Sequence, residues 1–357
     1  MKVLFLTKYS FMGASSRYRT LQYFPFFETM GVSCTHSPLF GDDYLNSLYQ
    51  KKNRGIIILK SFFYRASLLI FRIANYDLIV IEKEIFPYFS AIFERYLFYK
   101  KTPYLLDYDD AIFHNYDKSN CILIRQLFKN KIPTVIKNSR GVIAGNNYLL
   151  EYVKRYKSDK VYYLPTVINV NKYTPKVEGS NEKFIVGWIG SPSTSKNIIM
   201  LNNPLKRFCY KHDATIRLIG FDKDMASSLE FPHEVINWVH DHESNEISKF
   251  NVGIMPLIDS PFNRGKCGLK LIQYHGCALP VIASPVGVNK KIISHGHNGF
   301  LANSDNDWYV YLELLYKNNS LRQQMGERGR NKIEEEYNLD KTNIEYYNII
   351  TSFNHHN

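Results

Sequence analysis

A chain of 357 residues, 45% of them hydrophobic, is long enough for two domains of ordinary size. It has no apolar run of about 18 residues, which argues against a spanning helix, and its five scattered cysteines lack a C-x-x-C pair, which argues against a disulfide framework or structural zinc site. The net charge is +12, which requires an acidic partner or a large solvated face.

The first residues, MKVLFLTKYS, contain too short an apolar run for a secretory signal. We therefore expect a first buried strand and a cytoplasmic protein.

Much of the positive charge lies in one aromatic-rich segment. Residues 51–101 carry ten lysines and arginines against four acidic residues, and ten minus four gives +6. Basic residues beside exposed aromatic side chains suit an anionic membrane surface, so we expect peripheral association with the inner face of the cytoplasmic membrane. Alternatively, the aromatics form core and the lysines a solvated face. No zinc-finger, helix-turn-helix or RNP-type pattern supports a nucleic-acid partner.

Short apolar runs alternate with helix-length stretches along the whole chain, as in parallel sheets with crossover helices. The alternation predicts two facing, doubly wound, Rossmann-like α/β domains with a cleft between them, where ligands bind beyond the carboxyl ends of the strands. The runs occupy residues 3–6, 77–82, 104–108, 141–145 and 161–165 in the first half, and 184–190, 216–220, 235–239, 252–257 and 280–284 in the second.

The domain boundary shows as a loss of this apolar pattern. The segment VNKYTPKVEGSNEK gathers proline, glycine and serine, which predicts a linker at 173–182 between an amino-terminal domain, 1–172, and a carboxyl-terminal domain, 183–338. The last residues, 339–357, are predicted to form a helix that packs back on the first domain.

A candidate anion site follows the first strand of the second domain. Gly190, Ser191, Ser193 and Lys196 place backbone N–H groups, hydroxyls and an ammonium between a buried strand and a helix, where a diphosphate would bind. The alternative is a capped helix start in which the hydroxyl residues supply only cap oxygens.

The stretch RGKCGLKLIQYHGCALPVIASPVGVN supplies a second candidate site. On a helix, Lys266, Lys270 and Gln273 would share one face, with Lys266 near the positive helix end and Gly268 opening the backbone. The two lysines would then bind phosphates. A plain solvated face is the alternative.

The order of these motifs, with VHDHESNEISKFNVGIMPL and HNGFL, resembles the carboxyl-terminal half of GT-B glycosyltransferases of family 4. In the first half, TKYSFMGASSRYRTLQYFPFFETMGVSCT, LLDYDDAIFH, AGNNYLLEYVKRY and YLPTVIN agree. The resemblance implies transfer of a sugar from a nucleotide-sugar, with retention and without a metal or other cofactor. It also places Glu243 where the family holds the nucleoside.

The sequence departs from this family at two positions. The family carries two glutamates eight positions apart, and this chain has Gly265 and Gln273 there. In the family, the second glutamate accepts hydrogen bonds from both ribose hydroxyls, whereas Gln273 can accept from one through its carbonyl. We interpret the change as a retuned donor site, in which Lys266 and Lys270 add attraction for the diphosphate.

The amino-terminal loop GASSRYR offers further contacts for the nucleotide-sugar. Gly13 allows close backbone approach, Ser16 can donate, and Arg17 and Arg19 share one side if the segment is extended. An arginine aimed at the diphosphate would stabilise leaving-group charge, a catalytic role that we give to Arg17. A surface arginine pair capping a loop is the alternative.

Two adjacent carboxylates follow a strand in LLDYDDAIFH. We expect Asp109, and next Asp110, to position or deprotonate an acceptor hydroxyl. A metal would need a second acidic cluster, which is missing, so no metal is expected. The acceptor expected is a saccharide or lipid-linked saccharide, a surface-polysaccharide precursor. Alternatives are a nucleotide-sugar epimerase or hydrolase of the same fold, and a catalytically weak subunit that binds a partner transferase or membrane.

Overall fold

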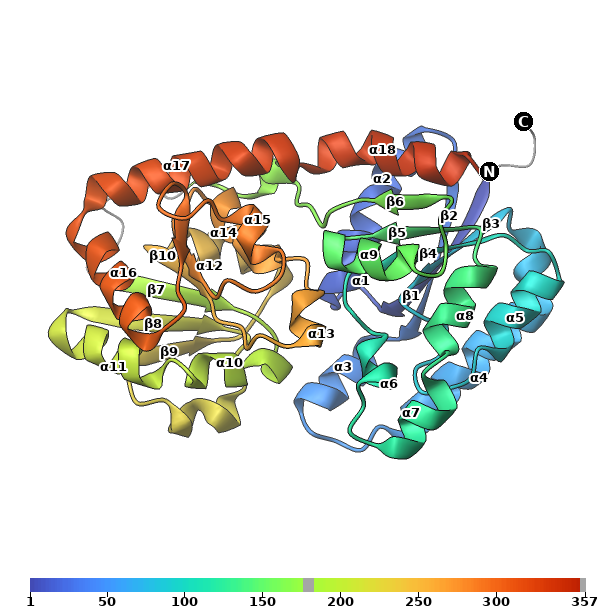
Figure 1. The fold of residues 1–357 in the computed structure, drawn as a ribbon, viewed down its shortest axis with the longest axis horizontal. Coiled ribbons are helices and arrows are strands. Elements are labelled where there is room, and N and C mark those ends of the chain that lie inside the picture. The colour runs from blue at the N-terminus through green and yellow to red at the C-terminus, as the bar shows by residue number, and fades with distance from the viewer. Residues whose placement is uncertain (176–182, 354–357) are drawn as a thin grey trace. The chain divides into compact units, whose positions relative to one another are not determined.

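The computed structural model describes residues 1–175 and 183–353, drawn in Figure 1. The chain folds into two compact units. Unit 1 comprises Met1–Thr166, Arg264–Cys267 and the end of the chain from Leu339, and unit 2 comprises Val167–Asn263 and Gly268–Asn338. Most of the predicted linker, 173–182, lies outside the described residues.

Unit 1 is built on a six-stranded parallel sheet with the order β2-β1-β3-β4-β5-β6. Its strands are β1 (Lys2–Tyr9), β2 (Ser33–Phe40), β3 (Leu78–Glu82), β4 (Tyr104–Tyr108), β5 (Gly141–Ala144) and β6 (Val161–Tyr163). Its helices are α1 (Ala14–Arg19), α2 (Phe24–Thr29), α3 (Asp42–Tyr49), α4 (Gly55–Phe71), α5 (Ile92–Tyr99), α6 (His114–Asp117), α7 (Ile122–Phe128), α8 (Lys131–Asn138), α9 (Asn147–Lys154) and α18 (Leu339–Thr351).

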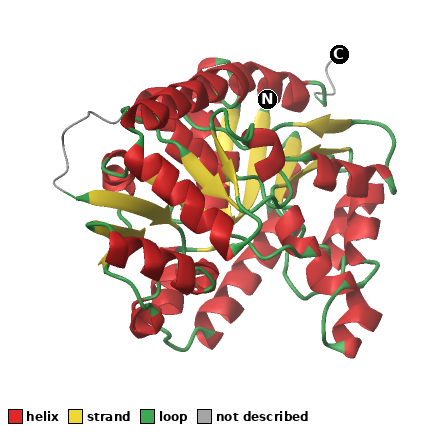
Figure 2. Ribbon diagram, turned by 60° about the vertical axis from the view of Figure 1, so that its left-hand side comes forward, coloured by secondary structure: helices red, strands yellow, loops and turns green. Residues whose placement is uncertain are grey.

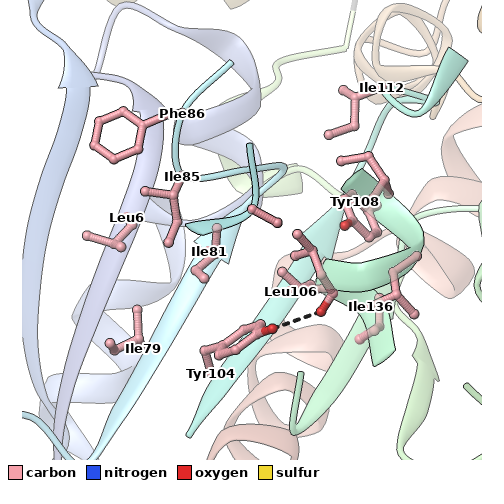
Figure 3. Packing of buried hydrophobic residues seen from close by; sticks show 14 of the residues in the cluster. Leu6, Ile79, Ile81, Ile85, Phe86, Tyr104, Leu106, Tyr108, Ile112 and Ile136 are labelled. Carbon is pink, nitrogen blue, oxygen red and sulfur yellow. Dashed lines mark hydrogen bonds between the residues drawn. The ribbon is translucent and has the colours of Figure 1, made fainter. Parts of the chain in front are cut away.

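The core of unit 1 follows from the continuous apolar runs of its central strands, which are buried on both faces. Figure 3 shows Leu6, Ile79, Ile81 and Leu106 packed together in this core. The hydroxyl of Tyr104, buried in the same core, donates to the carbonyl of Val135 at 2.9 Å, so its polar end is satisfied.

Unit 2 repeats the architecture with a six-stranded parallel sheet of order β12-β11-β10-β7-β8-β9; Figure 2 shows strands in yellow and helices in red. The strands are β7 (Phe184–Ile189), β8 (Ala214–Ile219), β9 (His233–Ile236), β10 (Val252–Met255), β11 (Val281–Ala283) and β12 (Gly299–Leu301). The helices are α10 (Lys196–Ile199), α11 (Asn202–Lys211), α12 (Glu243–Ser248), α13 (Pro261–Arg264, whose last residue falls in unit 1), α14 (Leu269–Gly276), α15 (Asn289–Ile292), α16 (Asp305–Lys317) and α17 (Asn319–Glu336).

Two parallel six-stranded sheets flanked by helices confirm the predicted fold class. Each of the ten predicted strand runs coincides with or overlaps an observed strand, but β2 and β12 were not predicted. Both are edge strands. β2, with the sequence SCTHSPLF, is half polar and contains a proline, which edge strands tolerate and central strands do not, so it lacks the apolar run that marked the others.

Helix α18 (Leu339–Thr351) forms within the predicted terminal segment, 339–357. α17 ends at Glu336, and α18 begins at Leu339 within unit 1, where Tyr346 packs edge-on against Tyr23 at 4.9 Å and Phe27 at 5.3 Å between ring centroids. Across residues 1–175 and 183–353, no helix combines the length and the apolar character needed to cross a membrane.

Candidate functional site

The candidate residues of unit 1 gather where β1, β3 and β4 end, around a lysine that the sequence reasoning did not select. The Nζ atom of Lys83 lies 3.1 Å from Asp109 Oδ1 and 2.9 Å from Asp110 Oδ2, and it donates to Ser15 Oγ at 3.0 Å. Lys83 is buried and has a φ of 66°, a left-handed conformation that costs free energy in a non-glycine residue. The structure therefore brings both predicted aspartates together, on one ammonium.

The charges of this cluster support one another. Burial alone would raise the pKa of Asp110, but Lys83 and Lys266, whose Nζ is 3.7 Å away, lower that pKa to about 2. Burial acts to lower the pKa of Lys83, and the two aspartates hold it well above its usual value. Asp110 is thus a carboxylate at physiological pH, but so low a pKa makes it a weak proton acceptor, better suited to holding a hydroxyl than to deprotonating it.

Glu82, the last residue of β3, was also missed by the sequence reasoning. Its side chain is buried, and Ser16 Oγ donates to its Oε2 at 2.7 Å. Burial raises the pKa of Glu82 to about 7, against the opposing effect of Lys83. The sequence feature that could have indicated Glu82 is its position, since it is a carboxylate at the carboxyl end of a buried strand. The hydroxyl of Ser16, which was predicted to contact the nucleotide-sugar, donates to Glu82.

The two predicted arginines do not lie on one side of an extended segment. Residues 14–19 form helix α1, in which side chains two positions apart point in different directions, so that expectation was wrong. Gly13 is the N-cap of this helix, and a Cβ atom built there would lie 2.4 Å from Cβ of Tyr9. Glycine is needed at this position for the helix to start against β1.

Arg19 is fully engaged inside unit 1. Its Nε donates to Asp107 Oδ2 at 3.0 Å, its Nη2 donates to the other oxygen of the same carboxylate, and its Nη1 donates to the carbonyl of Leu164 at 2.7 Å. These contacts disfavour the predicted role of Arg19 in binding the nucleotide-sugar, and that role stays a prediction. Arg17 is buried too, and its Nη1 donates to the carbonyl of Phe11 at 3.1 Å.

The missing family glutamate at position 265 has a packing explanation. The segment Arg264–Cys267 belongs to unit 1, where Asn146 Nδ2 donates to the carbonyls of Gly265 at 2.8 Å and Lys266 at 3.1 Å. A Cβ atom built at Gly265 would lie 2.5 Å from Cβ of Ala111 and 2.8 Å from its backbone nitrogen. A glutamate therefore does not fit here unless the turn after Asp110 moves.

In unit 2, Glu243 and Gln273 are direct partners. Nε2 of Gln273 donates to Glu243 Oε1 at 2.7 Å and to the hydroxyl of Tyr173 at 3.0 Å. The same Glu243 oxygen accepts from the Tyr173 hydroxyl at 3.2 Å, and its other oxygen accepts from Trp238 Nε1 at 2.5 Å. A buried carboxylate supplied by α12 thus lies beside position 273.

This arrangement also explains the amide at position 273. A glutamate there would place two buried carboxylates at hydrogen-bonding distance, and both could not be ionised at little cost. Because the amide nitrogen of Gln273 donates to Glu243, its carbonyl oxygen points away from that carboxylate.

Lys270 lies beside the glycine loop that follows β7. Its Nζ is 4.3 Å from the ring centroid of Trp188, within cation–π range. A Cβ atom built at Gly190 would lie 2.8 Å from this Nζ and 2.3 Å from the Trp188 ring, so the glycine makes room for both. The structure therefore brings together two residues predicted to bind phosphate, from separate motifs.

The rest of the loop has features of a capped helix start as well as of an anion site. Thr194 Oγ1 donates to the Ser191 carbonyl at 2.9 Å and accepts from its N–H at 3.3 Å, which is helix-start geometry. Ser191 and Ser193 share a hydrogen bond at 3.0 Å, and Ser193 and Lys196 are exposed.

Helix α14 starts later than predicted. Gly268 is its N-cap with a φ of 71°, a conformation that favours glycine, and the first helical residue is Leu269. Lys266 therefore precedes the helix and shares no helix face with Lys270 and Gln273, which corrects the prediction. In unit 1, Lys266 instead faces Asp110.

Among residues 1–175 and 183–353, no three or more His, Cys, Asp or Glu side chains are grouped to hold a metal ion. Metal-independence stays a prediction, because it concerns the reaction.

Comparisons with known proteins identify related chains and folds. Residues 183–318 match the family model described as glycosyl transferases group 1. An uncharacterized glycosyltransferase of Methanocaldococcus jannaschii is 32% identical over 95 residues, which are 26% of this chain and 24% of that protein, so the match spans about a quarter of that relative.

Solved structures resemble this chain over nearly its whole length. Sucrose-phosphate synthase from Thermosynechococcus elongatus superposes with a TM-score of 0.72 at 14% identity, covering 99% of this chain and 98% of that one. HepE of Anabaena, in complex with UDP and glucose, gives 0.70 at 14% identity, covering 99% and 100%. At such identities the likeness shows a shared fold, GT-B.

Proposed function

We propose that the chain, whose residues 183–318 match the family model of glycosyl transferases group 1, transfers a sugar from a nucleotide-sugar to an acceptor hydroxyl. The observation that carries the proposal is the placement of Lys270 against Trp188 and Gly190, at the carboxyl end of β7 and inside the matched region. Carboxyl ends of parallel strands are where Rossmann-like sheets bind ligands.

In the proposed donor site, Lys270 and the Gly190 loop bind the diphosphate, with Ser191, Ser193 and Lys196 along the loop. Glu243 and Gln273 hold the nucleoside, because the two side chains are direct partners at 2.7 Å and both lie inside the matched region. We propose a uridine nucleotide, since structures of HepE, which shares the fold, hold UDP or UDP-glucose.

The proposed acceptor is a lipid-linked or surface-polysaccharide precursor, processed at the inner face of the cytoplasmic membrane, with retention and without a metal. Asp109 positions its hydroxyl, while Asp110, with its low pKa, stays charged beside Lys83. Arg17 is proposed to stabilise charge on the leaving diphosphate. Lys266, whose ammonium pairs with Asp110, would add positive charge to the same site.

Thermal unfolding with a panel of UDP-, GDP- and ADP-sugars tests the donor proposal. A ligand at 100 times its dissociation constant stabilises the native state by about 2.7 kcal/mol, and we expect this for UDP-sugars. Lys270→Ala should remove the stabilisation, and the matched change Lys317→Ala, an exposed lysine on α16, should keep it.

Stabilisation by none of the nucleotides would contradict the proposal. Turnover separates the alternatives: release of the sugar to water at full rate without acceptor would indicate a hydrolase, and donor binding without any turnover would indicate a catalytically weak subunit.

A further inference from the structure

Helix α4 is apolar on the face that it turns to solvent. Its inner face packs Leu68 and Leu69 into the core of unit 1, as expected for a surface helix. Its outer face should be polar, yet Phe63 is 77% exposed and Phe71 is 81% exposed. The exposed apolar side chains of α4 follow the helical spacing of a single broad face: Ile56, Leu59, Phe63, Tyr64, Ile70 and Phe71.

The apolar surface continues over neighbouring elements of the same unit. Ring contacts link α4 to α5 through Phe62, Phe86 and Phe93, with centroids 4.9 Å apart at each step. Tyr88 contacts Tyr116 at 5.7 Å, and Tyr116 contacts Phe128 of α7 at 6.0 Å. The exposed apolar side chains of these elements are Tyr88, Phe89, Ile92, Phe98, Tyr99, Ile122, Leu123 and Leu127.

This concentration is unusual within the described part of the chain. Of its 24 exposed large hydrophobic side chains, 14 lie between Ile56 and Leu127. A gathering of this kind on one unit marks an interaction surface, whereas single exposed hydrophobic residues are normal.

The exposed charge of the same region is almost entirely positive. Of the four acidic residues in 51–101, Glu82, Glu84 and Glu94 are buried, which leaves Asp77, and its Oδ2 accepts from the backbone N–H of Lys2 at 2.7 Å. Of the ten basic residues, two are buried. The eight that reach solvent are Lys51, Lys52, Arg54, Lys60, Arg72, Arg95, Lys100 and Lys101.

We propose that the outer face of α4, together with the exposed side chains of residues 88–101 and of α7, is a docking surface for anionic phospholipid headgroups. We name it the α4 face. Its apolar side chains enter the boundary between headgroups and acyl chains, while the flanking lysines and arginines pair with lipid phosphates. α4 has 17 residues and contains Lys60 and Arg65, so it lies in the interface and does not span.

Charge complementarity favours lipid over a second copy of the chain. Two α4 faces would bring like charges together, which opposes self-association, whereas an anionic leaflet attracts them. The inference deepens the proposed function, because it specifies how the enzyme would reach a lipid-linked acceptor, and it rests on that function only for the identity of this acceptor.

Sedimentation with vesicles tests the α4 face. We expect the wild type to bind vesicles that mix phosphatidylglycerol with phosphatidylcholine. Its binding to vesicles of pure phosphatidylcholine should be weaker by roughly tenfold or more. Phe63→Ser/Phe71→Ser and Lys60→Glu/Lys101→Glu should each lower the partition coefficient on anionic vesicles roughly tenfold or more. The matched control Tyr210→Ser/Leu314→Ser, which removes exposed apolar side chains from unit 2, should bind as the wild type does.

Three results would overturn the proposal. They are absence of binding by the wild type, equal losses in the control variant, and a lipid-free dimer, measured by light scattering, that Phe63→Ser/Phe71→Ser dissociates. Circular dichroism checks that each variant is folded. UDP-sugar binding measured without vesicles keeps the two proposals separate, because donor binding should be unchanged in every α4-face variant.

Discussion

The two units both bury carboxylates beyond their strand ends, but they neutralise them in different ways. In unit 1, Asp109 and Asp110 share the ammonium of Lys83. In unit 2, Glu243 accepts from the hydroxyl of Tyr173, the indole of Trp238 and the amide of Gln273, which are all neutral donors. Opposite charges hold the first cluster together, and three neutral groups donate hydrogen bonds to the carboxylate of the second.

This difference determines how each cluster responds to a single substitution. Removing one member of a buried ion pair leaves an uncompensated charge in a low-dielectric region, which costs several kcal/mol. Removing one of several neutral donors costs about 1 to 3 kcal/mol, because the remaining donors still satisfy the carboxylate. A single substitution in the unit 1 cluster should therefore cost more unfolding free energy than a single substitution in the unit 2 cluster.

The largest effect is expected for Lys83→Met. The substitution keeps the length of the side chain but takes the ammonium away from buried Asp109 and leaves half-buried Asp110 with Lys266, which should cost about 3 to 5 kcal/mol of unfolding free energy at pH 7. Urea denaturation measures the loss. Lys60→Met, on the exposed face of α4, is the control and should change stability by less than about 0.5 kcal/mol. Equal, small losses in the two variants would show that the unit 1 cluster is not held by its charges.

A pH dependence is expected from Glu82. Burial raises its pKa to about 7 in the folded state, above its ordinary value of 4.5, so the folded protein binds the extra proton. Its contribution to stability is fully present below about pH 4.5 and is lost as the pH rises through about 7, for a total of about 3 kcal/mol. Glu82→Gln should remove this dependence and leave the protein more stable at pH 8. Denaturation midpoints of both proteins between pH 4.5 and 8 measure it, and parallel curves would contradict it.

Gln273→Glu should destabilise unit 2 more mildly. It sets a second carboxylate against Glu243, where the amide now donates at 2.7 Å, and should cost about 1 to 3 kcal/mol. The double variant Gln273→Glu/Glu243→Gln restores one carboxylate and one amide, so it should recover most of the loss. Additive losses in this double-mutant cycle would show that the two side chains are not coupled.

Most of the fold could be predicted from the sequence, because strands buried on both faces leave continuous apolar runs such as VLFL and DLIVIE. The exceptions lie at sheet edges. β2 is half polar and β12, with the sequence GFL, has only two apolar side chains, so neither leaves such a run. Their places in the sheets come from pairing with β1 and β11, which local sequence does not record.

The site was predicted less completely. Motif order selected Lys270, Gly190, Glu243 and Gln273, but their partners come from distant parts of the chain. That Gly265 must be a glycine depends on Ala111, which is far away in sequence and lies against it in unit 1. Lys83 appeared only as one basic residue in a charged segment, because its role depends on the loop after β4.

The smallest effect on stability is expected for Lys270→Met. This substitution tests whether Lys270 differs in role from Lys83. Lys83 lies between two carboxylates, whereas Lys270 stacks over the ring of Trp188, and a cation–π contact of this kind contributes about 0.5 to 1 kcal/mol. The nucleotide-free protein should therefore lose less stability in urea than Lys83→Met does, while its stabilisation by UDP-sugars falls sharply, since the ammonium is proposed to bind the diphosphate. A loss as large as that of Lys83→Met would mean that Lys270 serves the fold of unit 2 and not the donor.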